Sequence, residues 1–237
     1  MRNIIRRPFR YTNNNAVFWL IGINIVIFAV MQFMGNNYSV PVEIPTNTFT
    51  PQGRHIILTG NIDLFTYLFS MWPYRVINDG TIWTFVTYMF MHGSVTHILF
   101  NMLGLYIFGV HVERQMGSRE FLLYYFVTGA LAGIFSFVVY LMTGRPYVML
   151  VGASGALYAV MLAYAIFYPA SIIYIWGILP LRAPVMVLGY TALELFSSIT
   201  RSNSGVAHLT HLAGFAFGWL YFMIRYNVNP LRRLLGR

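Results

Sequence analysis

The sequence predicts an all-α, polytopic membrane protein with six transmembrane helices, and three observations lead to that fold class. First, 58% of the 237 residues are hydrophobic and only 9% are charged, whereas about 25% of the residues of a soluble domain are charged. Second, the mean hydropathy is +0.63. Third, apolar segments close to the roughly 20 residues that cross a bilayer core recur along the chain. We therefore expect the lipid bilayer to surround most of this protein.

Six apolar segments account for the predicted spans. Arginines precede the first one, as in a signal peptide, but it is 19 residues long and has no small-residue cleavage site, so we expect a retained span. The fourth and fifth are short for a complete crossing. The segments are 16–34, 94–112, 121–142, 153–168, 183–199 and 207–225.

The longest polar stretch separates the first two predicted spans. Residues 35–80 contain several prolines and glycines, which interrupt regular structure. Residues 81–91 are apolar and aromatic but end at His92-Gly93, so we expect an interfacial or re-entrant segment there. Ser94 suits the N-cap of the second span.

The arginines predict the orientation in the membrane. With the N-terminus inside, all 15 except Arg54, Arg75, Arg145 and Arg201 flank the inner ends of the spans, as the positive-inside rule requires. Both termini are then cytoplasmic, and the short tails suit a bacterial plasma membrane. The net charge of +9 is explained by these flanking arginines, so we expect no nucleic-acid partner.

Three polar side chains lie near the outer ends of predicted spans. His97 is in the second span, Ser154 opens the fourth, and His211 is in the sixth. Polar groups at membrane depth are costly unless they are buried and paired, which makes each one a candidate functional residue. All three fall within about 10 Å of the outer helix ends at 1.5 Å per residue. They can therefore meet in one shallow cavity that opens to the outer side.

Ser154 and His211 form a candidate nucleophile and general base. A serine hydroxyl becomes a good nucleophile when a neighbouring base takes its proton, and histidine suits that role near neutral pH. A triad would add an acid, and Glu194 is the one acid within a predicted span, but its position relative to His211 cannot be derived from the sequence. A Ser-His dyad is the simpler hypothesis, with Glu194 structural and His208 as an alternative base.

Neighbouring residues could complete such a site. His97 and Asn101 are four residues apart and project from one helix face, so their side chains could stabilise an oxyanion together with the amide of Ser154. Tyr158, one turn deeper than Ser154, is expected to pack its ring against His211.

Small residues predict that the fourth and sixth spans approach closely. Gly214 and Gly218 lie on the face that carries His211, and Gly155 begins a stripe of small residues along the fourth span. Faces of this kind allow membrane helices to pack at short distance, which would bring the serine to the histidine.

Four strings of residues follow one another in a specific order. They are Met91-His92-Gly93-Ser94, His97-Ile98-Leu99-Phe100-Asn101, Gly152-Ala153-Ser154-Gly155 and Ala207-His208…His211-Leu212-Ala213-Gly214. Together they resemble the rhomboid family of intramembrane serine proteases over about residues 81–225. The string Glu113-Arg114-Gln115-Met116-Gly117-Ser118 is similar to the family's second loop. One departure is that Thr84, and not arginine, follows Trp83.

The resemblance implies a rhomboid-like six-helix membrane domain over 16–225. Its long first loop, 35–93, would lie partly in the membrane, between a basic cytoplasmic N-tail, 1–15, and a basic C-tail, 226–237. Substrates would be single-span membrane proteins, cut near the top of a helix that unwinds easily.

The resemblance also implies roles for individual residues. Ser154 would be the nucleophile and His211 the base, and an active enzyme is expected because both are present. No cofactor and no metal are implied. The supporting residues would be His97 and Asn101 as oxyanion donors, Tyr158 beneath the histidine, and Gly152 beside the serine.

Two other classes of function stay open at this stage. A haem or metal protein could use His97, His208 and His211 as ligands, although Leu209 stands where a zinc protease of the His-Glu-x-x-His type has glutamate. A non-catalytic binder of membrane helices is the other class. A transporter is disfavoured because the two halves show no repeat. The natural substrate and the oligomeric state cannot be derived from the sequence.

Overall fold

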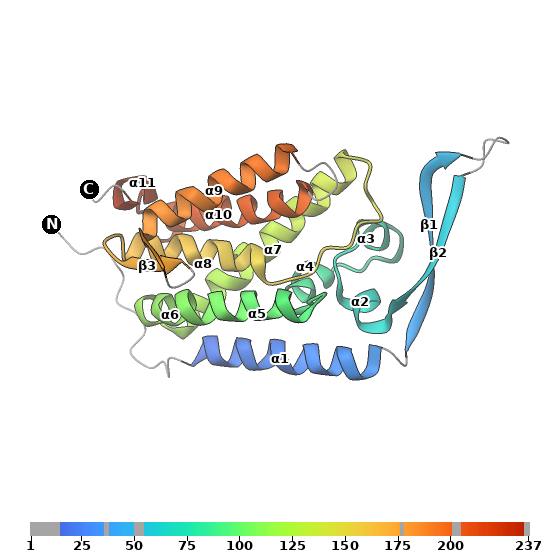
Figure 1. Ribbon diagram of the computed structural model, residues 1–237, viewed down its shortest axis with the longest axis horizontal. Helices are drawn as coiled ribbons and strands as arrows, with labels where there is room; N and C mark the ends of the chain where they lie inside the picture. The colour runs from blue at the N-terminus through green and yellow to red at the C-terminus, as the bar shows by residue number, and fades with distance from the viewer. Residues whose placement is uncertain (1–14, 36–37, 50–54, 176–177, 201–204, 235–237) are drawn as a thin grey trace.

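The computed structural model describes residues 15–35, 38–49, 55–175, 178–200 and 205–234. Helices form a bundle, with α7, α8 and α10 in mutual contact and α9 and α1 packed against them. Figure 1 shows the hairpin β1–β2 at one end of this bundle, beyond the short helices α2–α4, and α11 at the opposite end.

Each of the six predicted spans coincides with a helix. The second span is a continuous rod in which α5 passes through the π-helical turn η2 into α6. The bounds are α1 Ala16–Gly35, α5 Val95–Gly104, η2 Leu105–Gly109, α6 Val110–Met116, α7 Ser118–Met142, α8 Ser154–Phe167, α9 Ala183–Thr200 and α10 Gly205–Arg225.

Three of these helical segments are long and apolar enough to cross a membrane within the described residues. They are Ala16–Met34, Val95–Met116 and Ser118–Met142. Helix α8 is apolar but has only 14 residues. The protein is therefore a mostly helical, multi-span membrane protein.

The expectation of an all-α chain was wrong for the first loop. Strands β1 (Ser39–Phe49) and β2 (His55–Asp63) pair antiparallel from Ser39↔Asp63 to Phe49↔His55, with an irregularity after Pro45. Prolines in this stretch suggested a loop, but an edge strand tolerates proline because one side of it has no partner strand. A second, shorter hairpin joins β3 (Ile172–Ile175) to β4 (Leu179–Arg182).

Short helices fill the rest of the first loop. The chain passes through α2 (Leu64–Phe69), α3 (Pro73–Asp79), α4 (Thr84–Thr87) and the 3₁₀ turn η1 (Tyr88–Phe90) before α5. The hydroxyl of Tyr88 donates to the carbonyl of Gly129 on α7 at 2.8 Å. The apolar 81–91 segment is therefore helical over residues 84–90 and anchored to the bundle. A last short helix, α11 (Pro230–Leu234), follows α10.

A buried arginine braces this loop from an unexpected position. Arg75 is 8% exposed, and its guanidinium donates to Asp79 at 2.8 Å and to the carbonyl of Tyr67. Its guanidinium carbon also lies 3.8 Å from the centre of the Tyr67 ring. Trp83 donates its indole N–H to the carbonyl of Leu68 at 3.0 Å. The chain therefore supplies a bracing arginine on α3, although none follows Trp83.

Glycines set the separation of α8 and α10. A Cβ on Gly214 would lie 2.0 Å from the backbone oxygen of Gly155, and one on Gly218 would lie 2.6 Å from the hydroxyl of Tyr124. That hydroxyl donates to the carbonyl of Ala159 at 2.6 Å. The backbones of α8 and α10 therefore touch, as small-residue faces allow.

Candidate active site

The candidate site lies where α5 and α8 begin, at the end of the bundle next to α2–α4 (Figure 1). Ser94 caps α5, and its hydroxyl accepts the amide of His97 at 3.1 Å, so the N-cap prediction is confirmed. Ser154 is the first residue of α8. His97 and Ser154 therefore both lie in the first turn of a helix, where backbone amides have no partner within the helix itself.

Ser154 and His211 are in direct contact. The serine Oγ lies 2.8 Å from the Nε2 of His211, which reaches it from α10. The imidazole stacks on the ring of Tyr158 with a centroid distance of 4.3 Å and an interplanar angle of 9°. The histidine ring is thus held in one plane while one of its nitrogens faces the serine.

The other nitrogen of His211 faces an acid. Its Nδ1 lies 2.9 Å from Oε1 of Glu194 on α9. The same carboxylate contacts the hydroxyl of Tyr158 at 2.5 Å and Nδ1 of His208 at 2.5 Å. Glu194 is paired, as expected for an acid in an apolar helix, but its partners are residues of the candidate site. Ser154 is hydrogen-bonded to His211, whereas His208 contacts Glu194.

Gly152 makes room for His97. It has φ +114°, and a Cβ there would lie 2.6 Å from the Nε2 of His97. Only glycine adopts that backbone conformation readily. The amide of Gly152 donates to the carbonyl of Tyr88 at 2.9 Å, which fixes the turn before Ser154. Gly152 therefore positions two parts of the site at once.

Asn101 lies one turn below His97 and is 4% exposed. Its side-chain amide donates to the carbonyl of His97 at 3.0 Å, while its Oδ1 is buried without a hydrogen-bond partner among the described residues. The ring of His92 is 5.0 Å from that of His97. Burial, with a smaller effect of His97, lowers the pKa of the His92 imidazole to about 4, so this ring is neutral at neutral pH.

Several of these residues line one cavity of about 430 Å³, which we call the site cavity. It exposes the nucleophile candidate, the base candidate and both donor candidates to the same space. Its lining residues are Ser94, Thr96, His97, Phe100, Asn101, Ser154, Leu157, Tyr158 and His211.

Comparison with protein families matches a rhomboid domain over residues 79–228. The chain belongs to the rhomboid family. That match includes α5 with its N-cap Ser94, α8 and α10, which together carry every side chain that lines the site cavity, and α9, which carries Glu194. Family membership makes this rhomboid an integral membrane protein.

Relatives of this rhomboid come from a plant and from bacteria. It is 32% identical to the mitochondrial rhomboid-like protein 12 of Arabidopsis thaliana over 153 residues, which cover 58% of this chain and 45% of the relative. It is 27% identical to the putative rhomboid protease YdcA of Bacillus subtilis, covering 61% and 67%. It is 35% identical to the rhomboid protease GlpG of Haemophilus influenzae over 83 residues, covering 35% and 40%. This rhomboid spans about half the length of the curated relatives it matches.

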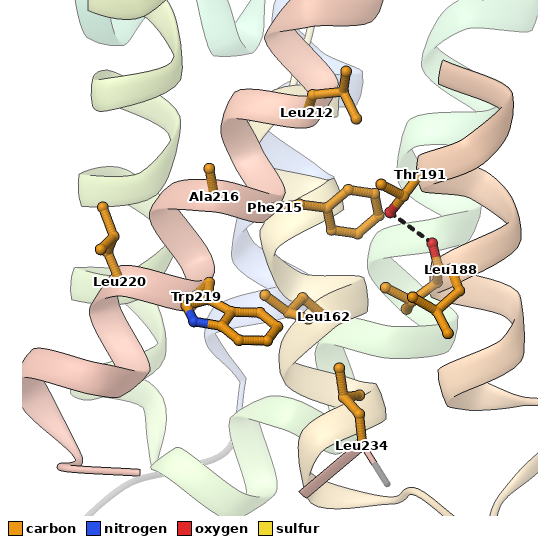
Figure 2. A pocket seen from close by; sticks show the side chains of 10 residues that line it. Leu162, Leu188, Thr191, Leu212, Phe215, Ala216, Trp219, Leu220 and Leu234 are labelled. Carbon is orange, nitrogen blue, oxygen red and sulfur yellow. Dashed lines mark hydrogen bonds between the residues drawn. The ribbon is translucent and has the colours of Figure 1, made fainter. Parts of the chain in front are cut away.

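A second cavity of this rhomboid has a different character. It measures about 520 Å³ and lies between α8, α9, α10 and the end of α11. Figure 2 shows Phe215 and Trp219 of α10 facing Leu188 and Thr191 of α9 across it. Its lining carries no acid and no histidine. Of these two cavities, only the site cavity is therefore lined by groups that could perform acid–base chemistry.

The structure groups the histidines differently from the ligand set that a haem or metal protein was expected to use. His208 and His211 come together with Glu194, their candidate ligand atoms lying within 4.8 Å of one another, and His97 is not part of this group. Two imidazoles and a carboxylate are a donor set that zinc accepts. Here, however, each Nδ1 already lies at hydrogen-bond distance from the carboxylate.

Sequence reasoning missed the position of Glu194 in this rhomboid. A signal was present, because an acid within an apolar helix needs a partner and the nearby polar groups on the predicted spans were the site histidines. The rotation of α9 about its own axis decides which of them Glu194 meets, and that rotation follows from packing against α8 and α10.

Proposed function

We propose that this rhomboid is an intramembrane serine endopeptidase that cleaves transmembrane segments of membrane proteins. The observation that carries the proposal is the 2.8 Å contact between Ser154 Oγ and His211 Nε2 at the wall of the site cavity. A hydroxyl in contact with an imidazole nitrogen can transfer its proton as it attacks a carbonyl.

The proposed reaction has two halves. Ser154 Oγ attacks the peptide carbonyl and its proton passes to His211 Nε2. The tetrahedral intermediate collapses, the C–N bond breaks, and His211 gives that proton to the departing amine. Water then attacks the Ser154 ester with His211 as base, the ester bond breaks, and the proton returns to Ser154 Oγ.

Donors for the oxyanion are available at the cavity wall. The amide of Ser154 lies in the first turn of α8, where it has no helical partner. Asn101 uses one amide hydrogen on the carbonyl of His97, which leaves the second for substrate. His97, which also lines the cavity, is the third donor. Such donors stabilise the negative charge that forms in the transition state.

The helix lengths support cleavage inside the membrane. With 14 residues, α8 is about 21 Å long, which is shorter than the roughly 30 Å hydrocarbon core. If the C-terminal end of α8 lies at the inner membrane surface, Ser154 lies below the outer membrane surface. Water then reaches Ser154 through the site cavity. This proposal includes six spans, cytoplasmic termini and a first loop, 35–93, that lies partly in the membrane.

A fluorophosphonate probe tests the nucleophile. We expect covalent labelling of the detergent-purified protein, with the adduct located on Ser154 by mass spectrometry. Ser154→Ala and His211→Ala should both fold and both lose labelling, because one lacks the oxygen and the other the base. Labelling that persists in Ser154→Ala would remove Ser154 as nucleophile. A wild-type protein that neither labels nor cleaves a model single-span substrate would reject the protease.

A metal protein is the second candidate, because Glu194, His208 and His211 form a possible ligand set. The two functions predict different metal dependence. A serine protease cleaves at the same rate after EDTA treatment, whereas a metal protein purifies with stoichiometric metal and loses its property on chelation. Elemental analysis and an absorbance spectrum in the haem region, taken on the same sample, distinguish them.

A further inference from the structure

We propose that Glu194 is a positioning residue that converts the Ser154–His211 pair into a Ser-His-Glu triad. Its carboxylate orients His211, holds the ring in the tautomer that can accept a proton, and stabilises the imidazolium that forms during attack. This inference rests on the proposed function. It goes beyond the dyad because it assigns a third residue, on a different helix, to the same proton transfer.

Three donors converge on the Glu194 carboxylate. Oε1 lies 2.9 Å from His211 Nδ1 and 2.5 Å from the Tyr158 hydroxyl, and Oε2 lies 2.5 Å from His208 Nδ1. Glu194 is only 8% exposed. An ionised carboxylate can only accept hydrogen bonds, so its surroundings suit the charged form, and each of its three partners donates.

This arrangement determines the tautomer of His211. Because Nδ1 donates to Glu194, a neutral imidazole carries its proton there and its lone pair on Nε2. Nε2 is the atom 2.8 Å from Ser154 Oγ, so the serine donates to it. Without an acceptor at Nδ1 nothing would keep the proton on that nitrogen. The carboxylate therefore selects the form of His211 that can act as a base.

Tyr158 links the orientation of the ring to the position of the acid. Its own ring stacks on His211 at 4.3 Å, and its hydroxyl donates to the same Oε1 that accepts from His211. The plane of the imidazole is thus set by stacking, and its rotation within that plane is set by Ser154 and Glu194 on opposite sides. A ring held at both nitrogens needs no reorganisation when attack begins.

His208 then has an explanation other than catalysis. It lies one turn before His211 on α10 and donates to Oε2, the oxygen that His211 does not use. It therefore anchors the carboxylate from the second side. The same geometry makes metal binding and catalysis exclusive, because a metal would need a lone pair on Nδ1 of His211. The proton would then be on Nε2, facing Ser154, and His211 could not accept another.

Two variants separate the charge of Glu194 from its hydrogen bond. In Glu194→Gln the amide oxygen can still accept from His211 and Tyr158, so the tautomer is kept and the negative charge is lost. Methionine has a similar length, and Glu194→Met removes both the charge and the hydrogen-bond acceptor. Thr191→Ala is the matched control, because Thr191 lies one turn earlier on α9 and its hydroxyl donates to the carbonyl of Val187 and to no other group among the described residues. Circular dichroism and thermal unfolding show which variants are folded.

We expect graded losses in the second-order rate constant for fluorophosphonate labelling and in kcat for a model substrate, with KM unchanged. Replacing the corresponding aspartate by asparagine in a soluble serine protease lowers kcat by about 10⁴-fold, there because the histidine takes the wrong tautomer. Glu194→Gln should therefore lose about 10²-fold or more and Glu194→Met a further factor, while Thr191→Ala stays within about two-fold. Glu194→Gln and Glu194→Met that both label at the wild-type rate would overturn the proposal.

A spectroscopic measurement tests the tautomer independently of turnover. In protein labelled with ¹⁵N-histidine, with His211 assigned by its loss in His211→Gln, the wild type should show a proton on Nδ1 and none on Nε2 at neutral pH. Glu194→Met should lose this fixed pattern, and Thr191→Ala should keep it. A wild-type His211 protonated on Nε2 overturns the proposal.

The two measurements also separate this inference from the protease assignment. An unlabelled wild type rejects the nucleophile whatever the tautomer of His211 is. A labelled wild type with unaffected Glu194 variants leaves the Ser154–His211 dyad and rejects only the third member.

Discussion

Asn101 illustrates how one side chain can be held by its own helix and still serve a site. Its amide bonds the carbonyl of His97, one turn back on α5, and its side chain lines the site cavity. Asn24 makes the same bond in α1, to the carbonyl of Leu20 at 2.8 Å, but lines neither cavity described above. Comparing variants of these two asparagines therefore distinguishes a structural role of the side chain from a role in the reaction.

At the residue scale, Asn101→Ala should slow fluorophosphonate labelling and substrate cleavage. Loss of one oxyanion donor costs about 10²–10³-fold in rate when other donors remain. Asn101→Asp should be at least as slow, because a carboxylate offers no donor and repels the developing charge. Asn24→Ala is the control and should label at the wild-type rate. Equal rates for Asn101→Ala and Asn24→Ala would remove Asn101 from the oxyanion site.

At the scale of elements, the contact between α8 and α10 brings the serine to the histidine. Gly214 lies three residues after His211 and touches Gly155, the residue after Ser154. The contact that sets the separation of the two helices therefore lies within one helical turn of both reactive residues. No other pair of helical glycines has such a close backbone approach among the described glycines.

Gly214→Ala should therefore damage both stability and activity. A methyl group 2.0 Å from the backbone oxygen of Gly155 cannot be relieved by a side-chain rotation, so the helices must separate. Overpacking of this kind costs about 1–3 kcal/mol, and sometimes more. Gly189→Ala on α9 is the control, because its new Cβ meets nothing within 4 Å. Thermal unfolding and probe labelling of both variants measure the difference, and an unaltered Gly214→Ala would contradict the proposed role of this contact.

At the scale of the whole molecule, one buried acid ties α1 to the bundle far from the site. Glu113 on α6 accepts the backbone amides of Ala16 and Val17 at 2.8 and 3.0 Å and the hydroxyl of Ser118 at 2.5 Å. It thus caps the first turn of α1, where helix amides lack partners. Figure 1 shows α6 at the end of the bundle opposite α2–α4, so this cap and the site cavity lie at opposite ends.

We expect Glu113→Ala to lower stability and to leave the chemistry of the folded protein unchanged. Loss of a helix cap costs about 0.5–2 kcal/mol, and the buried amides of α1 would lose their acceptor. Glu113→Gln should fall between this variant and the wild type. The midpoint of thermal unfolding measures the first effect, and the labelling rate at low temperature measures the second. A large fall in the labelling rate of folded Glu113→Ala would mean that the two ends are coupled.

Several parts of the fold were predictable because their signals are local. Length and apolarity predicted where all six helices lie, and Ser94 predicted the start of α5. The hairpin β1–β2 was missed because its prolines have the same local signature as a loop. The role of Arg75 was missed because its acceptors, Asp79 and the carbonyl of Tyr67, are brought to it only by the fold of the first loop.

The sequence by itself determined the class of protein and the residues capable of chemistry. Helix length, charge and the spacing of Ser154 and His211 within their helices depend on neighbours along the chain. The tertiary structure alone decided that Glu194 meets Nδ1 of His211 while Ser154 meets Nε2. The physical reason is that lipid-facing and protein-facing residues of a membrane helix are equally apolar, so hydrophobic periodicity does not reveal how the helix is rotated. Close packing of small residues sets that rotation, and only the assembled helices bring the acid, the base and the nucleophile into one line.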